Sequence, residues 1–128
     1  MDKIKKIAVV EDEAAIMDIY KIKLKLSGYQ VVTAENGDVA IKIIKKEKPD
    51  LVLLDILLPK KDGFEVLDEI RKSEDEKIKS TPVIITSNLS NEEDIQEAKN
   101  IGIVDYVIKA KSTPLEIIKK IDKFFNKK

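Results

Sequence analysis

The stretch LVLLD, residues 51–55, decides the fold of this chain. Four consecutive apolar residues followed by an acid are typical of a strand that is buried on both faces, as at the centre of a parallel sheet. Four further apolar, β-branched runs lie at residues 4–10, 30–34, 82–86 and 104–108. Stretches with helical spacing follow the strands, at residues 13–27, 39–46, 64–72, 90–102 and from 113 onward. The sequence therefore predicts five βα units, which means an α/β fold with a doubly wound parallel sheet and helices on both faces.

Local signals mark where these elements begin and end. Ser27-Gly28 and Gly102 are expected to end helices, and Asn36-Gly37 is expected to form a turn. Two S/T-x-x-E sequences, beginning at Ser90 and Thr113, predict capping boxes at the starts of the last two helices. The polar segment 73–81 is expected to be a loop. Since no linker or repeat interrupts the pattern, we expect residues 1–128 to form one domain with no output domain.

Composition excludes several classes of chemistry. The 128 residues include no Cys and no His, so a thiol nucleophile, an imidazole base and a His- or Cys-ligated metal are all excluded. The 24 basic residues balance 24 acidic ones and include a single arginine, Arg71, which argues against nucleic acid as a direct partner. No apolar run approaches the length of a membrane span, and no signal peptide begins the chain. We therefore expect a cytoplasmic protein without membrane insertion.

Polar residues follow the predicted strands at the edge where ligands bind in open α/β sheets. Glu11-Asp12 follow the first strand, Asp55 ends the third, Thr86-Ser87 end the fourth and Lys109 follows the fifth. Each of these residues alone is an ordinary cap or surface charge, but their convergence on one edge indicates a site. Clustered carboxylates stay ionised only beside a cation, and oxygen ligands without His or Cys favour Mg²⁺. Carboxylates, an ammonium, a hydroxyl and Mg²⁺ together are suited to phosphoryl transfer, with a carboxylate as nucleophile.

At residues 4–125 the chain resembles the receiver domains of bacterial two-component response regulators. The resemblance rests on the acids of VVEDE, on Asp55 in LVLLDILLPKKDG with Pro59 and Gly63, on PVIITS and on DYVIK. It implies a flavodoxin-like sheet in the order 2-1-3-4-5. It also implies that the domain is a phosphoacceptor for signalling rather than an enzyme, with at most slow self-phosphorylation and self-dephosphorylation.

The resemblance further implies a role for each residue of the site. Asp55 would take the phosphoryl group from a histidine kinase or a phosphotransfer protein. Mg²⁺ would be bound by Asp12, by Asp55, by the backbone carbonyl of Leu57 and, through water, by Glu11. Lys109 would pair with the phosphoryl oxygens. Thr86 would bind one of these oxygens and vacate space for Tyr106. That rotation would repack the face of helix 4, strand 5 and helix 5 for a target protein or a second copy of the chain.

The chain departs from the family pattern at three places. Ala110 stands where the family has proline after the lysine, and we expect the Lys109-Ala110 bond to be trans because a non-proline cis bond costs about 2.5–4 kcal/mol. Glu11 replaces the commoner Asp, which a water-mediated role tolerates. Leu57 and Asn88 lie where family members tune self-dephosphorylation, and because Leu57 cannot orient a water molecule we expect slow loss of phosphate.

Three other interpretations fit parts of the sequence. A degenerate receiver would fold and bind a partner without being phosphorylated, and Ala110 leaves room for this. A haloacid-dehalogenase-like phosphatase would also use an Asp nucleophile and Mg²⁺, but it needs a second acid where this chain has Leu57. A flavodoxin would need a Ser/Thr/Gly-rich phosphate loop in place of EDEAA.

Overall fold

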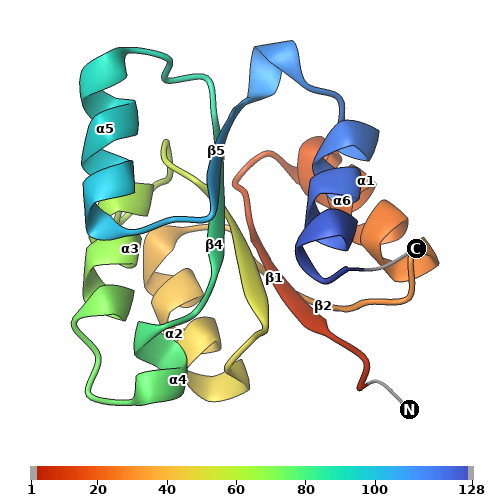
Figure 1. Ribbon diagram of the computed structural model, residues 1–128, viewed down its shortest axis with the longest axis horizontal. Coiled ribbons are helices and arrows are strands. Elements are labelled where there is room, and N and C mark those ends of the chain that lie inside the picture. Colours follow the sequence, from red (N-terminus) through yellow and green to blue (C-terminus); the bar gives the residue numbers. More distant parts are fainter. Residues whose placement is uncertain (1–2, 127–128) are drawn as a thin grey trace.

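The five apolar runs form one parallel sheet in the computed structural model, which describes residues 3–126 (Figure 1). The strands run in the order β2-β1-β3-β4-β5. Their bounds are β1 Lys6–Val10, β2 Gln30–Ala34, β3 Leu51–Asp55, β4 Val83–Ser87 and β5 Asp105–Ile108. Every neighbouring pair is parallel, so all five carboxyl ends lie at the same edge. The predicted fold class and sheet order are confirmed.

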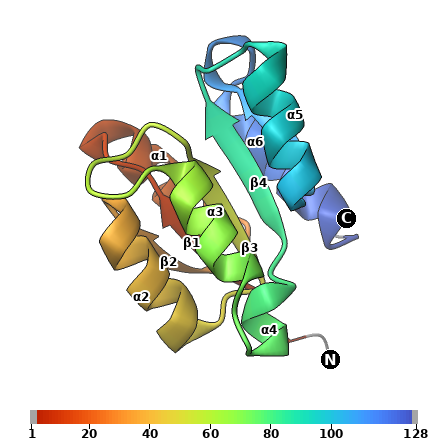
Figure 2. The same cartoon turned by 90° about the vertical axis from the view of Figure 1, so that its left-hand side faces the viewer.

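Helices cover both faces of this sheet. Figure 1 shows α1 and α6 on one face and α2, α3 and α5 on the other, and Figure 2 shows the second group from its outer side. The helices are α1 Ala14–Leu26, α2 Gly37–Glu47, α3 Gly63–Arg71, α4 Glu76–Lys79, α5 Glu92–Ile101 and α6 Pro114–Phe124, with a 3-10 turn η1 at Lys109–Lys111. Within residues 3–126, no helix is both long enough and apolar enough to cross a membrane.

The central strand β3 joins two cores. Leu51 and Leu53 pack with α1 and α6, whereas Val52 and Leu54 pack with α2, α3 and α5. All five residues of β3 are buried, as the uninterrupted apolar run predicts. Burying apolar side chains on both faces supplies the main driving force for folding, and it fixes the position of Asp55 at the end of the strand.

Two helix starts differ from the sequence prediction by a residue or two. Asn91, not Ser90, caps α5, and its side chain accepts the Asp94 N–H at 2.9 Å. Both residue types are good caps, so the sequence alone did not separate them. Asn36 caps α2, which therefore begins at Gly37 instead of following a separate turn. The capping box at Thr113 is confirmed, and Gly102 ends α5 with a φ of 116°.

The predicted loop 73–81 contains a short helix, α4. Asp75 caps it by accepting the Ile78 N–H at 3.2 Å, and the Ile78 side chain is buried against the core on the α3 side. One apolar residue in a polar segment gives no periodicity, so the sequence did not predict this turn. Because of α4, the helix that the sequence counts as the fourth is α5 of the structure, and the fifth is α6.

Candidate functional site

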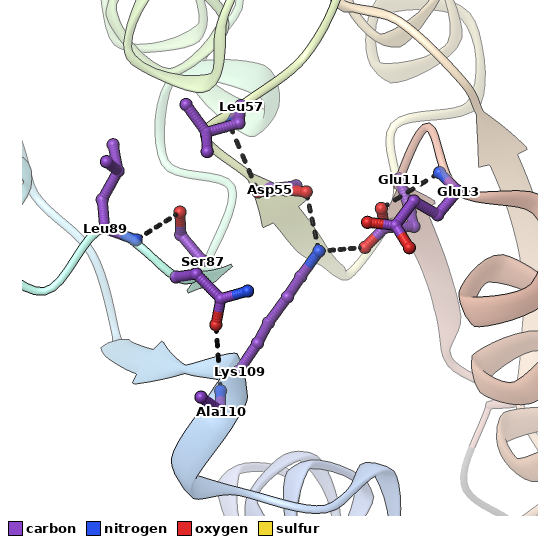
Figure 3. Close-up of polar contacts among 9 residues, drawn as sticks. Glu11, Glu13, Asp55, Leu57, Ser87, Leu89, Lys109 and Ala110 are labelled. Atoms are coloured by element: carbon purple, nitrogen blue, oxygen red, sulfur yellow. Dashed lines mark hydrogen bonds and ion pairs between the residues drawn. The ribbon is translucent and has the colours of Figure 1, made fainter.

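The carboxyl ends of β1, β3 and β5 bring Glu11, Asp55 and Lys109 together at one edge of the sheet (Figure 3). The Lys109 Nζ lies 2.5 Å from Glu11 Oε1 and 2.7 Å from Asp55 Oδ2. The exposed fractions of these side chains are 12% for Lys109, 1% for Glu11 and 6% for Asp55. The predicted convergence of β1, β3 and β5 therefore produces a buried ionic cluster.

Gly63 allows α3 to begin next to Asp55. A Cβ atom at this position would lie 2.4 Å from the Asp55 carbonyl oxygen and 2.7 Å from the Ile56 Cα. The Gly63 N–H donates to the Ile56 carbonyl at 2.8 Å, which ties the start of the helix to the end of β3. The glycine is therefore required by the close approach of two backbones.

Burial and the neighbouring charges shift the pKa values of the cluster in opposite directions. Burial raises the pKa of Glu11, and the hydrogen bonds from Lys109 and from the Glu13 N–H offset only part of this rise. Burial would lower the pKa of the Lys109 ammonium, but its hydrogen bonds to Asp55 and Glu11 raise that pKa above its usual value. The lysine is thus held in its charged form between two acids.

Asp12 extends the cluster towards solvent. Glu11, Asp12 and Asp55 can each offer one carboxylate oxygen such that these atoms lie within 4.8 Å of one another. A hollow of about 280 Å³ opens beside Glu11 and Asp12, and the acidic residues Asp18 and Glu35 also line it. Three carboxylates against one ammonium leave an excess of negative charge, and their oxygen atoms suit a hard divalent cation such as Mg²⁺. The predicted ligand residues therefore lie together, and they fit this ion.

The backbone after Asp55 orients the second oxygen of its carboxylate. The Leu57 N–H donates to Asp55 Oδ1 at 3.2 Å, so Lys109 and Leu57 hold different oxygens of the same group. The Leu57 side chain is 55% exposed and offers no polar atom. Asp55 is thus fixed at both carboxylate oxygens, and the neighbouring Leu57 side chain offers it no further polar contact.

The alternation of β4 separates Thr86 from Tyr106, which were predicted to act together. Ile84 packs on the α1 and α6 side of the sheet and Ile85 on the other, so the alternation of β4 directs Thr86 to the first side and Ser87 to the second. Tyr106 packs on that second side. The Leu89 backbone joins Ser87 to Tyr106: the Leu89 N–H donates to the Ser87 hydroxyl oxygen at 3.2 Å, and the Tyr106 hydroxyl donates to the Leu89 carbonyl at 2.7 Å.

Thr86 lies next to Asp55 along the sheet. Its Cα is the sheet partner of Asp55 on one side and of Val107 on the other. Thr86 therefore lies beside the acceptor strand, but across the sheet from Tyr106. The sequence marks Ser87 only as a strand end, because the register that makes Thr86 the partner of Asp55 is seen only in the structure.

The Lys109-Ala110 segment keeps Lys109 in the site without a cis bond. No peptide bond among the described residues is cis, so the expected trans bond is confirmed. The Ala110 N–H donates to Asn88 Oδ1 at 3.0 Å. A proline at position 110 would have no N–H to make this contact.

A parallel sheet in this order, with acids and a lysine at its carboxyl edge, is the arrangement of a signal-receiver domain. Residues 7–122 match the family described as response regulator receiver domain, and the chain belongs to that family. It functions as the receiver domain of a response regulator in two-component signalling.

Relatives and solved structures agree with this membership. The chain is 43% identical over 104 residues to "Probable transcriptional regulator ycf27" of Porphyra purpurea, covering 81% of this chain and 41% of that protein. The chain thus spans about two fifths of the length of that relative. A CheY-like receiver domain protein from Methanospirillum hungatei JF-1 has a TM-score of 0.87 at 27% identity, covering 97% of this chain and 95% of the other. The phosphorylated cyanobacterial phytochrome response regulator RcpA has a TM-score of 0.84 at 34% identity, covering 95% and 94%.

Proposed function

We propose that Asp55 accepts a phosphoryl group from the phosphohistidine of a sensor histidine kinase or of a phosphotransfer protein. The observation that carries the proposal is the buried contact of Asp55 with Lys109 at 2.7 Å, beside Glu11 and Asp12. A carboxylate oxygen of Asp55 attacks phosphorus while the bond from phosphorus to the donor imidazole nitrogen breaks. The electron pair of that bond stays on the imidazole, and the product is an acyl phosphate on Asp55.

The residues around Asp55 favour this transfer by position and charge. Lys109 is held in its charged form and neutralises the oxygens of the incoming group. Asp12 and Asp55, the Leu57 carbonyl and, through water, Glu11 would bind Mg²⁺. When bound, this ion neutralises the charge that develops on the phosphoryl oxygens. Positioning and charge neutralisation account for most of the catalysis in phosphoryl transfer.

The response passes through Ser87 and Tyr106. Ser87 follows the sheet partner of Asp55, and its hydroxyl accepts from the N–H of Leu89, whose carbonyl accepts from Tyr106. A Ser87 hydroxyl that turns towards the phosphoryl group gives up its bond to Leu89 and loosens the contact of Leu89 with the tyrosine. Tyr106 then exchanges its bond to the Leu89 carbonyl for a more buried position. This step repacks the face formed by α5, β5 and α6, where a downstream target protein or a second copy of the chain would bind. A phosphoryl group must favour one of the two packings by a few kcal/mol for this switch to work.

The partner of the domain is another protein surface. The relative from Porphyra purpurea is named a probable transcriptional regulator and is more than twice as long as its match. Contacts of a whole protein with nucleic acid would lie outside the matched region. The domain itself has one arginine and no net charge, so we propose protein partners for it.

Intact mass after incubation with acetyl phosphate tests the proposal. The wild type should gain one phosphoryl group in the presence of Mg²⁺ and not in its absence, and Asp55→Asn should gain none. Thr86→Val and Ser87→Ala should both gain the phosphoryl group. Phosphorylation of the wild type should change the fluorescence of Tyr106, and only Ser87→Ala should abolish this change. No gain in a folded wild type would favour a degenerate receiver that binds its partner without phosphorylation.

A further inference from the structure

A hydrogen bond joins the two loops that carry the switch hydroxyl and the lysine. Asn88 Oδ1 accepts the Ala110 N–H at 3.0 Å. Asn88 directly follows Ser87, and Ala110 directly follows Lys109. Ser87 and Ile108 are the last paired residues of β4 and β5, so the contact continues the link between these strands beyond the sheet.

The turn that carries Lys109 is weakly held by its own backbone. η1 spans three residues, and its Ser112 N–H lies 3.4 Å from the Lys109 carbonyl oxygen, at the long end of the range for a hydrogen bond. The preceding strand β5 is at the edge of the sheet and has a neighbour only in β4. A tie from β4 to Ala110 therefore restrains the backbone next to Lys109.

We propose that Asn88 is a positioning residue for Lys109. It holds the Lys109-Ala110 backbone so that the ammonium reaches Asp55, and it links any movement of Ser87 to that backbone. This inference rests on the proposed function, since it concerns phosphorylation of Asp55. It also gives a physical reason for a residue other than proline at position 110, because only a residue with an N–H can donate to Asn88.

Mg²⁺ affinity distinguishes this positioning role from a general structural role, because the metal-binding acids lie at the ends of other strands than the Asn88 contact. Glu11 and Asp12 follow β1 and Asp55 ends β3, whereas the contact joins the residues that follow β4 and β5. Loss of the Asn88 side chain should therefore slow phosphorylation without lowering Mg²⁺ affinity, because an ammonium that moves away from the acids does not weaken their binding of a cation. A general loosening of the site would change both quantities.

The test compares Asn88→Ala with Asn88→Asp, which keeps the acceptor oxygen, and with Asn100→Ala, which removes an exposed amide on α5. The rate of mass gain from acetyl phosphate at saturating Mg²⁺ should fall about three- to tenfold in Asn88→Ala, because a small misplacement of a charged group slows a positioned reaction. Asn88→Asp should restore most of the rate, and Asn100→Ala should match the wild type. Mg²⁺ affinity, measured by titration calorimetry, should be no lower in any of the three variants than in the wild type.

Each other outcome overturns the inference. An unchanged rate in Asn88→Ala, no rescue by Asn88→Asp, or an equal loss of Mg²⁺ affinity would show that Asn88 does not position Lys109. If the wild type is not phosphorylated at all, the proposed function fails and this inference fails with it. A phosphorylated wild type with an unaffected Asn88→Ala contradicts only the role of Asn88.

Discussion

Replacing Lys109 by Met should destabilise the fold strongly, because the ammonium lies between two buried acids. Met keeps the length and the apolar part of the side chain, so the main change is the loss of one charge. Glu11 and Asp55 would then face each other without the cation that contacts both. Removing one partner of a buried ion pair typically costs about 3–5 kcal/mol. For a chain of this size that corresponds to a fall in Tm of about 10–20 °C.

Urea unfolding followed by circular dichroism, without divalent ions, measures this loss at pH 7.5 and at pH 5. Burial already raises the pKa of Glu11, and loss of Lys109 should raise it further. An acid whose folded pKa is raised destabilises the protein above that pKa and ceases to do so as the pH falls through it. The difference between the wild type and Lys109→Met should therefore be smaller at pH 5 than at pH 7.5.

The control is Lys111→Met, which changes an exposed lysine of the same turn. It should stay within about 0.5 kcal/mol of the wild type, as surface substitutions generally do. Added Mg²⁺ should recover part of the stability lost in Lys109→Met, because the ion replaces the missing positive charge. A Lys109→Met protein as stable as Lys111→Met at pH 7.5, or a loss that does not shrink at pH 5, would refute this reasoning.

Three further predictions follow from single residues. Leu57→Asn should shorten the half-life of the phosphorylated protein about tenfold, since an amide can orient a water molecule beside Asp55; an unchanged decay of the phosphorylated mass would contradict this. Burial raises the pKa of all three tyrosines, and most that of Tyr29, whose hydroxyl also donates to Asp122 at 2.5 Å. Tyrosinate absorbance of the folded protein should therefore develop only above pH 10. The free energy of unfolding should fall over the same pH range, because the unfolded tyrosines ionise first. A tyrosine that titrates at its ordinary pKa in the folded protein would speak against this burial. Gly63→Ala should cost about 1–3 kcal/mol in urea unfolding, because its Cβ would meet backbone at 2.4 Å, and an unchanged stability would show that α3 can move away.

The fold could be predicted because the apolar runs alone determine it. A strand buried on both faces, such as β3, must lie inside a sheet, and five apolar runs alternating with amphipathic helices leave few arrangements. The charged cluster followed from the same logic, since parallel strands place their carboxyl ends together. Asp55 and Lys109 are 54 residues apart in the chain but 2.7 Å apart at their charged atoms.

The identity of the hydroxyl beside Tyr106 could not be predicted from the pattern of β4. Its residues are buried on both faces, so hydrophobic alternation does not show which way each side chain points, and a shift of one residue exchanges the two faces. Thr86 and Ser87 were therefore equivalent in sequence, and the link to Tyr106 through Leu89 separated them. The bond from Ala110 to Asn88 was beyond prediction for another reason, because its donor is a backbone N–H that no side-chain pattern reveals.

The most direct test of the account is to locate the phosphoryl group by chemical trapping. Borohydride reduces an aspartyl phosphate to homoserine, which peptide mass spectrometry assigns to one position. After treatment with acetyl phosphate and Mg²⁺, the account predicts homoserine at position 55 alone. Homoserine at position 12, reduction of Glu11, or no reduced residue in a folded protein would contradict it.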